Sequence, residues 1–308
     1  MSRLTTFLRM NPVALFFRRR PIRDRIWSIF GPSGWIIDRT QAFEAATLRW
    51  LTRGRFYRSN ADTTPTVYIV GLFGSGRTYV SSIIENHFYE RALDFRDELK
   101  HESTPASMIY SGRMTLKYPS SEQNSPDVGN RIVQLVSSGT ARLIFIYRHP
   151  LDSLLANWVW WRSFLFRRDR GVSISSSFQS LQQLSEFVDR EWGSLEAFAL
   201  GDASFYGSSG YRFLSLSEFV EESVLLFERA TLNVRFEELA VNPYRAFVRL
   251  ADVISPEMHV RPSLHIQRPN AKPGAYSFVM KTVPRFEAFV NRLSPETKLL
   301  MMKLGYQC

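Results

Sequence analysis

A short apolar strand pattern that leads directly into a glycine-rich loop and then a helix pattern constrains this sequence most. Thr66–Val70 reads TVYIV, a β-branched and aromatic run typical of a buried strand. Residues 71–78 follow as GLFGSGRT, and residues 79–88 carry apolar side chains at helical spacing. Glycines at such a junction let backbone N–H groups turn toward an anion at a helix N-terminus. We interpret the loop as an anion site, with a tight structural turn as the alternative.

The rest of the chain alternates strand and helix patterns. Further strands are expected near residues 92–95, 114–117 and 232–236, and most clearly at Ala141–Tyr147, ARLIFIY. Helices are expected near residues 128–138, 150–165, 181–198, 244–253 and 295–303. The alternation predicts one α/β domain, P-loop-like, with a mainly parallel central sheet flanked by helices.

Positive charge is concentrated at the N-terminus. The 308 residues carry 39 Lys and Arg against 29 Asp and Glu, a net charge of +10. Residues 1–60 hold twelve Arg and three acids, so they supply +9 of that charge. We therefore divide the chain into a basic, arginine-rich extension at 1–62 and an α/β domain at 63–308. A nearly neutral domain argues against nucleic acid as a partner.

The basic extension also contains large apolar residues, which leaves two interpretations open. It could form a helix on an anionic membrane surface, or a solvated extension packed loosely on the domain. We find no run near the roughly 18 apolar residues of a membrane span, no signal-peptide pattern, and a single cysteine, Cys308. We therefore expect a cytoplasmic protein, peripheral on the inner face of the membrane if the extension binds there.

The sequence lacks the metal-binding carboxylate that usually accompanies a loop of this kind. Residues 71–78 have the spacing of a Walker A loop, with Arg77 where Lys is usual. Kinases and NTPases with such a loop also place a Mg²⁺-binding carboxylate at the end of another hydrophobic strand. The strongest strand pattern here ends in Arg148 and His149 instead. This favours a nucleotide that carries an extra phosphate and a transfer without a metal ion.

Three segments together resemble the PAPS-dependent sulfotransferases, which transfer a sulfuryl group from 3'-phosphoadenosine 5'-phosphosulfate (PAPS) to a hydroxyl or amine. Residues 71–79, GLFGSGRTY, are similar to the family's 5'-phosphosulfate loop. Residues 147–153, YRHPLDS, resemble its strand-Arg-x-Pro-x-Asp element for the 3'-phosphate. Residues 234–243, VRFEELAVNP, resemble its late strand. The resemblance spans about residues 66–306 and implies PAPS as donor and PAP, adenosine 3',5'-bisphosphate, as product.

The resemblance also implies roles for single residues. Arg148 is at the position that binds the 3'-phosphate, and Tyr79 is where an aromatic ring stacks on adenine. The backbone that should hold the 5'-phosphosulfate belongs to Gly74, Ser75, Gly76, Arg77 and Thr78.

Other residues that could bind the 3'-phosphate match the family pattern less closely. The family has a Ser eight residues after the Arg, where this chain has Ala156, so Ser153 or Asn157 is expected to substitute. Arg268 and Lys272 belong to a segment that is similar to the loop closing over the 3'-phosphate.

In-line displacement needs cations at the leaving oxygen and a base for the acceptor proton. We expect Arg77 and Lys117 to be those cations. Lys117 resembles a catalytic Lys that the family follows, two residues later, with a base His, but Pro119 occupies that position here. Four candidates for the base follow the strand near 92–95, although each could simply be solvated: Asp97, Glu98, His101 and Glu102.

A tryptophan-rich run suggests where an acceptor binds. Trp158 and Trp161 share the apolar face of the helix pattern and are expected in the core. Trp160 is off that face and could stack on a sugar ring. We expect a glycan, glycolipid or small-metabolite acceptor, carbohydrate in nature or lipid-linked.

Two other functions stay open at this point. One is a P-loop small-molecule kinase that uses Mg-ATP, with Asp94 or Asp152 as the magnesium ligand. The other is a non-catalytic, membrane-associated protein that binds a nucleotide.

Overall fold

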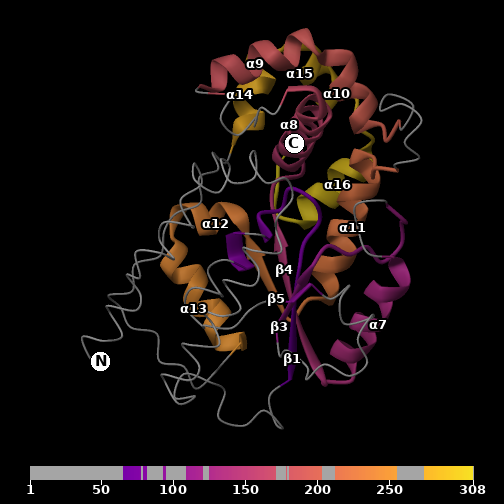
Figure 1. Cartoon of the computed structure of the whole chain (residues 1–308), viewed down its shortest axis with the longest axis vertical. Helices are drawn as coiled ribbons and strands as arrows, with labels where there is room; N and C mark the ends of the chain where they lie inside the picture. Colours follow the sequence, from indigo (N-terminus) through magenta and orange to yellow (C-terminus); the bar gives the residue numbers. More distant parts are fainter. Residues whose placement is uncertain are drawn as a thin grey trace. The chain divides into compact units, whose positions relative to one another are not determined.

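The computed structural model in Figure 1 describes residues 65–77, 79–81, 93–94, 109–120, 125–170, 178, 180–202, 212–254 and 274–307. For residues 93–94 and 163–170 the description covers the backbone. The extension at 1–62 lies outside the described residues.

Five parallel strands form the central sheet, in the order β2-β3-β1-β4-β5. Their bounds are Thr66–Val70 for β1, Leu93–Asp94 for β2, Ile109–Gly112 for β3, Ala141–Tyr147 for β4 and Leu232–Arg235 for β5. In the central register, Tyr68 lies opposite Tyr110 on one side and Leu143 on the other. Because all pairs are parallel, the carboxyl ends of the strands share one edge. The predicted α/β fold with a parallel central sheet is confirmed.

Alternate residues of the central strands build a core on each face of the sheet. Val67 and Ile69 of β1 pack in one cluster with residues of α13 (Pro243–Ile254), and the short helix α12 (Phe236–Val241) precedes that helix. Tyr68 contributes to the other cluster. That second cluster contains residues of α7 (Pro126–Ser137) and α11 (Leu216–Arg229). Figure 1 shows α12 and α13 on one side of the sheet, with α7 and α11 on the other.

A third cluster lies among helices at the carboxyl edge of the sheet. Trp158 is fully buried there, and its Nε1 donates to Ser194 Oγ at 2.9 Å. The helices that build this layer are α8 (Pro150–Arg170), α9 (Leu181–Arg190), α10 (Trp192–Ala199), α14 (Ala275–Thr282), α15 (Pro284–Asn291) and α16 (Pro295–Lys303). Within the described ranges, no helix is both long and apolar enough to cross a bilayer.

The third strand is not where the sequence pattern placed it. The prediction of a strand at 114–117 is wrong, because β3 ends at Gly112 and only an isolated bridge follows at Met114. The backbone N–H groups of residues 116, 117 and 118 donate instead to the buried carboxylate of Glu222, at 2.7, 2.7 and 2.5 Å. These bonds hold the segment as a turn against α11.

The helix predicted over 181–198 is interrupted. Glu191 has φ −101° and ψ 22°, which ends α9 and begins α10. Its carboxylate lies 2.5 Å from Arg162 Nη2 on α8. A tertiary ion pair therefore accompanies a break that the continuous apolar periodicity did not indicate.

Candidate functional site

The middle of the sheet brings the sequence motifs to one place. The chain leaving β1 goes to β2 on one side, whereas the chain leaving β4 goes to the adjacent strand β5 on the other. In open parallel sheets, ligands bind outside the carboxyl ends where the direction of the connections reverses. Residues 71–77 follow β1, Arg148 follows β4, and Phe236 follows β5, so all three segments lie at this edge.

Two glycines of the loop have a backbone conformation that other residues disfavour, and a Cβ at either would overlap a neighbouring side chain. Gly74 has φ +78° and Gly76 has φ +90°, in the left-handed region that side chains disfavour. A Cβ on Gly74 would lie 2.3 Å from Asn157 Oδ1, and a Cβ on Gly76 would lie 2.1 Å from the Phe236 ring. Helical structure begins at Arg77, and Tyr79 N donates to Gly76 O at 3.0 Å. The loop therefore leads into a helix N-terminus, as an anion site requires.

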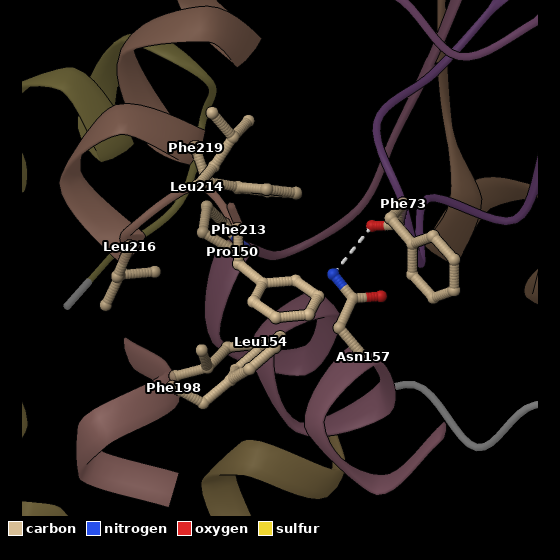
Figure 2. A pocket seen from close by; sticks show the side chains of 9 residues that line it. All are labelled: Phe73, Pro150, Leu154, Asn157, Phe198, Phe213, Leu214, Leu216 and Phe219. Atoms are coloured by element: carbon tan, nitrogen blue, oxygen red, sulfur yellow. Dashed lines mark hydrogen bonds between the residues drawn. The ribbon is translucent and has the colours of Figure 1, made fainter. Parts of the chain in front are cut away.

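Three buried polar atoms around the loop lack hydrogen-bond partners in the described part of the chain. They are Ser75 Oγ, Ser153 Oγ and Asn157 Oδ1. Leaving a buried polar atom unpaired costs about 1–3 kcal/mol. Asn157 uses its Nδ2 to donate to the backbone oxygen of Phe73 at 2.9 Å, a bond drawn in Figure 2. A polar ligand with both acceptor and donor atoms would satisfy this arrangement.

Arg148 is held beside the loop rather than extended into solvent. Its side chain is 9% exposed, and its Nη2 lies 3.6 Å from Asp152 Oδ2. Its Cζ lies 5.1 Å from the centroid of the Phe236 ring, and the same ring packs on Gly76. The three sequence motifs are therefore connected through Phe236.

Asp152 attaches the start of α14 to this site. Its Oδ2 accepts from Gly274 N at 2.7 Å, and its Oδ1 accepts from Tyr276 N at 2.9 Å. The side chain is fully buried. Both carboxylate oxygens are thus engaged with backbone N–H groups at a helix N-terminus, where an anionic side chain is stabilised.

His149 packs between the motifs. Its ring stacks on Tyr276 with centroids 3.7 Å apart, and its Nδ1 accepts from Leu151 N at 3.2 Å. Burial lowers the pKa of His149 to about 4. The imidazole is therefore neutral near pH 7 and does not add a cation to a phosphate site.

Glu237, which follows β5, accepts hydrogen bonds from the segment after β4 and from the C-terminal segment. It accepts from His149 N at 2.9 Å and from Tyr306 Oη at 3.1 Å. Arg235 lies 3.5 Å from its Oε2 and over the Tyr306 ring, 4.1 Å from the centroid. Burial raises the pKa of Tyr306 above its usual range, so its hydroxyl stays a hydrogen-bond donor. The third motif thus has a supporting role in this structure.

The two predicted cations have different surroundings. Arg77 Nη1 donates to Ser111 Oγ at 2.5 Å, at the carboxyl end of β3. Lys117 has a side chain 52% exposed, with its Nζ 2.5 Å from Glu221 Oε1 on α11. The hydrogen bond to Glu221 raises the pKa of Lys117. None of the contacts described for Lys117 involves the loop.

Sequence reasoning missed Arg113. Its Cζ lies 3.9 Å from the centroid of the Phe73 ring, so it contacts the loop. It is the first residue after β3. The preceding residues IYSG were the available signal, but the prediction placed the strand five residues later.

The aromatic residues near the loop divide as predicted. Trp158 and Trp161 are buried in the helical core, whereas Trp160 is 41% exposed. The Trp160 ring lies 4.9 Å from Phe73 and 5.1 Å from Trp161 in edge-on contacts. Tyr79 packs partly buried beside the β1 core, and burial raises its pKa to about 12.

A small cavity lies between the loop, α8, α10 and α11. Its volume of about 20 Å³ leaves room for about one water molecule. Figure 2 shows the side chains that line it: Phe73, Pro150, Leu154, Asn157, Phe198, Phe213, Leu214, Leu216 and Phe219. In this conformation the cavity is too small for a sugar or a nucleotide.

No protein-family model matches the sequence, and no curated protein has a matching sequence. Among solved structures, the chain is similar to mouse sulfotransferase SULT7A1 complexed with PAP. That similarity has a TM-score of 0.43 and 12% sequence identity, over 80% of this chain and 92% of the other. The identity is too low to transfer residue roles from that protein to this chain.

The remaining predicted site residues lie outside the described residues. They are Thr78, Asp97, Glu98, His101, Glu102, Arg268 and Lys272.

Proposed function

We propose that this chain is a sulfotransferase that moves a sulfuryl group from PAPS to a hydroxyl or amine of an acceptor. The observation that carries the proposal is the contact of the Phe236 ring with both Gly76 of the loop and the Arg148 guanidinium. A fixed arginine beside a phosphate loop suits a nucleotide with phosphate groups at two positions. The planar guanidinium offers paired donors for the second phosphate.

The 5'-phosphosulfate is assigned to backbone N–H groups of the loop. The N-terminal end of the following helix and the buried Ser75 hydroxyl support this assignment, because both can donate to phosphate oxygens. The residues are those inferred from the sequence: Gly74, Ser75, Gly76, Arg77 and Thr78. Tyr79 is proposed to stack on the adenine.

The 3'-phosphate is assigned to Arg148 and Ser153. Ser153 has a buried hydroxyl with no partner among the described residues, so it can donate to an anion. Asn157 is the weaker candidate, because its amide nitrogen already donates to Phe73 and its remaining oxygen would repel phosphate. We propose that Asn157 positions the loop, and that Arg268 and Lys272 add charge near the same phosphate.

PAPS supplies an activated sulfuryl group. The residues of this chain would hold its phosphates, align the acceptor oxygen in line with the breaking bond, and stabilise the charge left on the bridging oxygen. Arg77 is one proposed cation for that oxygen. The base that takes the acceptor proton is proposed among Asp97, Glu98, His101 and Glu102.

The kinase alternative would need a free carboxylate for magnesium. Both oxygens of Asp152 accept backbone N–H bonds, so of the two proposed magnesium ligands Asp152 is already engaged. The side chain of the other, Asp94, lies outside the described residues. Thermal unfolding of the full chain separates the two functions. PAP without magnesium should raise Tm, whereas Mg-ATP should not, and the reverse result would contradict the sulfotransferase proposal.

The acceptor is proposed to be a glycan, glycolipid or small metabolite, met by a cytoplasmic enzyme that can sit peripherally on an anionic membrane. The exposed Trp160 beside Phe73 supports a ring-bearing acceptor, because an indole face can stack on a sugar. Mass spectrometry of lipid and polysaccharide extracts incubated with enzyme and PAPS should detect a gain of one sulfate. No gain of a sulfate in any lipid, polysaccharide or small-metabolite extract would contradict this proposed class of acceptor.

A further inference from the structure

The carboxyl end of β3 reaches the phosphate loop at two points. Ser111, near the end of the strand, accepts a hydrogen bond from Arg77 at 2.5 Å. Arg113, the first residue after the strand, places its guanidinium carbon 3.9 Å from the centroid of the Phe73 ring. Phe73 directly precedes Gly74. Two arginines, one from the loop and one that directly follows β3, therefore lie at neighbouring ends of β1 and β3.

Lys117 does not share this position. Its ammonium pairs with Glu221 on α11, and its backbone N–H is held by the buried carboxylate of Glu222. Glu222 holds the backbone of this turn, and the Lys117 ammonium would have to leave Glu221 to approach the loop. Of the cations that follow β3, Arg113 is the one described in contact with the loop.

The position of Arg113 over the Phe73 ring is compatible with binding an anion. A guanidinium attracted to an aromatic ring keeps its positive charge and its planar set of N–H donors. The contact with the Phe73 ring places the Arg113 guanidinium at the loop. Planar donors of this kind suit the oxygens of a phosphate or a sulfuryl group.

We propose that Arg113, together with Arg77, supplies the positive charge around the transferred sulfuryl group, the role that the sequence assigned to Lys117. This inference rests on the proposed sulfotransferase function. In the transfer, the acceptor oxygen forms a bond to sulfur while the bond from sulfur to the bridging oxygen breaks. The electron pair stays on the bridging oxygen, which becomes part of PAP, and the acceptor proton goes to the base. Arg113 stabilises the sulfuryl oxygens and that developing charge.

The test compares two ligands that differ by the sulfuryl group. Calorimetry on the full chain, without acceptor, gives the Kd for PAPS and for PAP. For Arg113→Ala, the Kd for PAPS should rise about tenfold or more, since a charged hydrogen bond is lost, while the Kd for PAP should change less than about twofold. Arg113→Lys should retain part of the preference for PAPS. Arg249→Ala, which removes an exposed pair with Glu238, is the matched control and should leave both constants unchanged.

The other outcomes are distinct. Equal weakening of PAP and PAPS in Arg113→Ala would mean that Arg113 only supports the loop, and unchanged binding of both would also overturn the inference. If Arg113→Ala does not fold, Arg113→Gln gives the same comparison with the stem of the side chain retained. A wild-type chain that binds neither nucleotide would overturn the proposed function itself, before any variant is measured.

Discussion

The Phe236 ring occupies the space that a side chain on Gly76 would need. A Cβ at Gly76 would lie 2.1 Å from Cδ2 of that ring. The ring also lies under the Arg148 guanidinium. One aromatic side chain thus fixes the distance between the phosphate loop and the arginine proposed for the second phosphate.

Gly76→Ala should therefore abolish measurable PAP binding, because the loop must shift away from Phe236. The backbone strain alone costs about 1–2 kcal/mol, and the overlap with the ring adds to it. Gly139→Ala is the control, since Gly139 also has a positive φ, +76°, but nothing lies within 4 Å of its Cβ position. That variant should lose stability and keep its affinity for PAP. Calorimetry and thermal unfolding of both variants test this, and equal PAP binding by both would contradict it.

Arg148→Ala should weaken PAP binding by about 2–5 kcal/mol, because a nearly buried charge-assisted contact is lost. The affinity for AMP, which has no 3'-phosphate, should change much less. Arg249→Ala removes an exposed pair with Glu238 and serves as the control. A loss of PAP affinity below roughly tenfold for Arg148→Ala would count against the assignment.

Asp152→Ala should destabilise the protein by about 3–5 kcal/mol, since two backbone N–H groups and a neighbouring arginine lose a buried carboxylate. Urea unfolding measures the effect. Asp127→Ala, an exposed residue in the first turn of α7, should cost well under half as much. Similar losses in the two variants would show that the attachment of α14 contributes little.

His149 predicts a loss of stability in acid. Its pKa falls from an ordinary 6.5 to about 4 in the folded chain because of burial. The unfolded chain therefore binds a proton more readily, so the stabilisation is complete above pH 6.5 and is lost as the pH falls toward 4. The full effect is about 3 kcal/mol. Urea unfolding at pH 7 and at pH 4.5 should show a smaller pH dependence for His149→Phe than for the wild type; identical profiles would contradict this.

Deletion of residues 1–60 should weaken association with vesicles of anionic lipid and leave PAP affinity within about twofold, because the segment supplies +9 of the +10 net charge. Flotation with anionic and with neutral vesicles measures the first effect, and calorimetry the second. Loss of PAP binding on deletion would instead indicate that the extension packs against the domain.

Features that depend on neighbouring residues could be predicted from the sequence. The bounds of β1, β4 and α16 agree with their patterns, because a run of β-branched and aromatic residues and a proline at a helix start are local signals. The positions of Trp158 and Trp160, buried and exposed, also followed from helical periodicity. The sequence by itself therefore determined the α/β class and the place of the loop.

The tertiary structure decided the rest, because the deciding contacts join residues far apart in the chain. Residues Ile109–Gly112 pair with β1 and form β3, whereas the similar pattern that follows does not. The carboxylate of Glu222, more than one hundred residues later, binds the backbone N–H groups of that following segment and holds it as a turn. As a result, the Lys117 side chain is exposed, and Arg113 contacts the loop. Local patterns describe which residues can be strand or turn, but the register of a sheet and the partner of a buried carboxylate depend on the free energy of the whole packed domain.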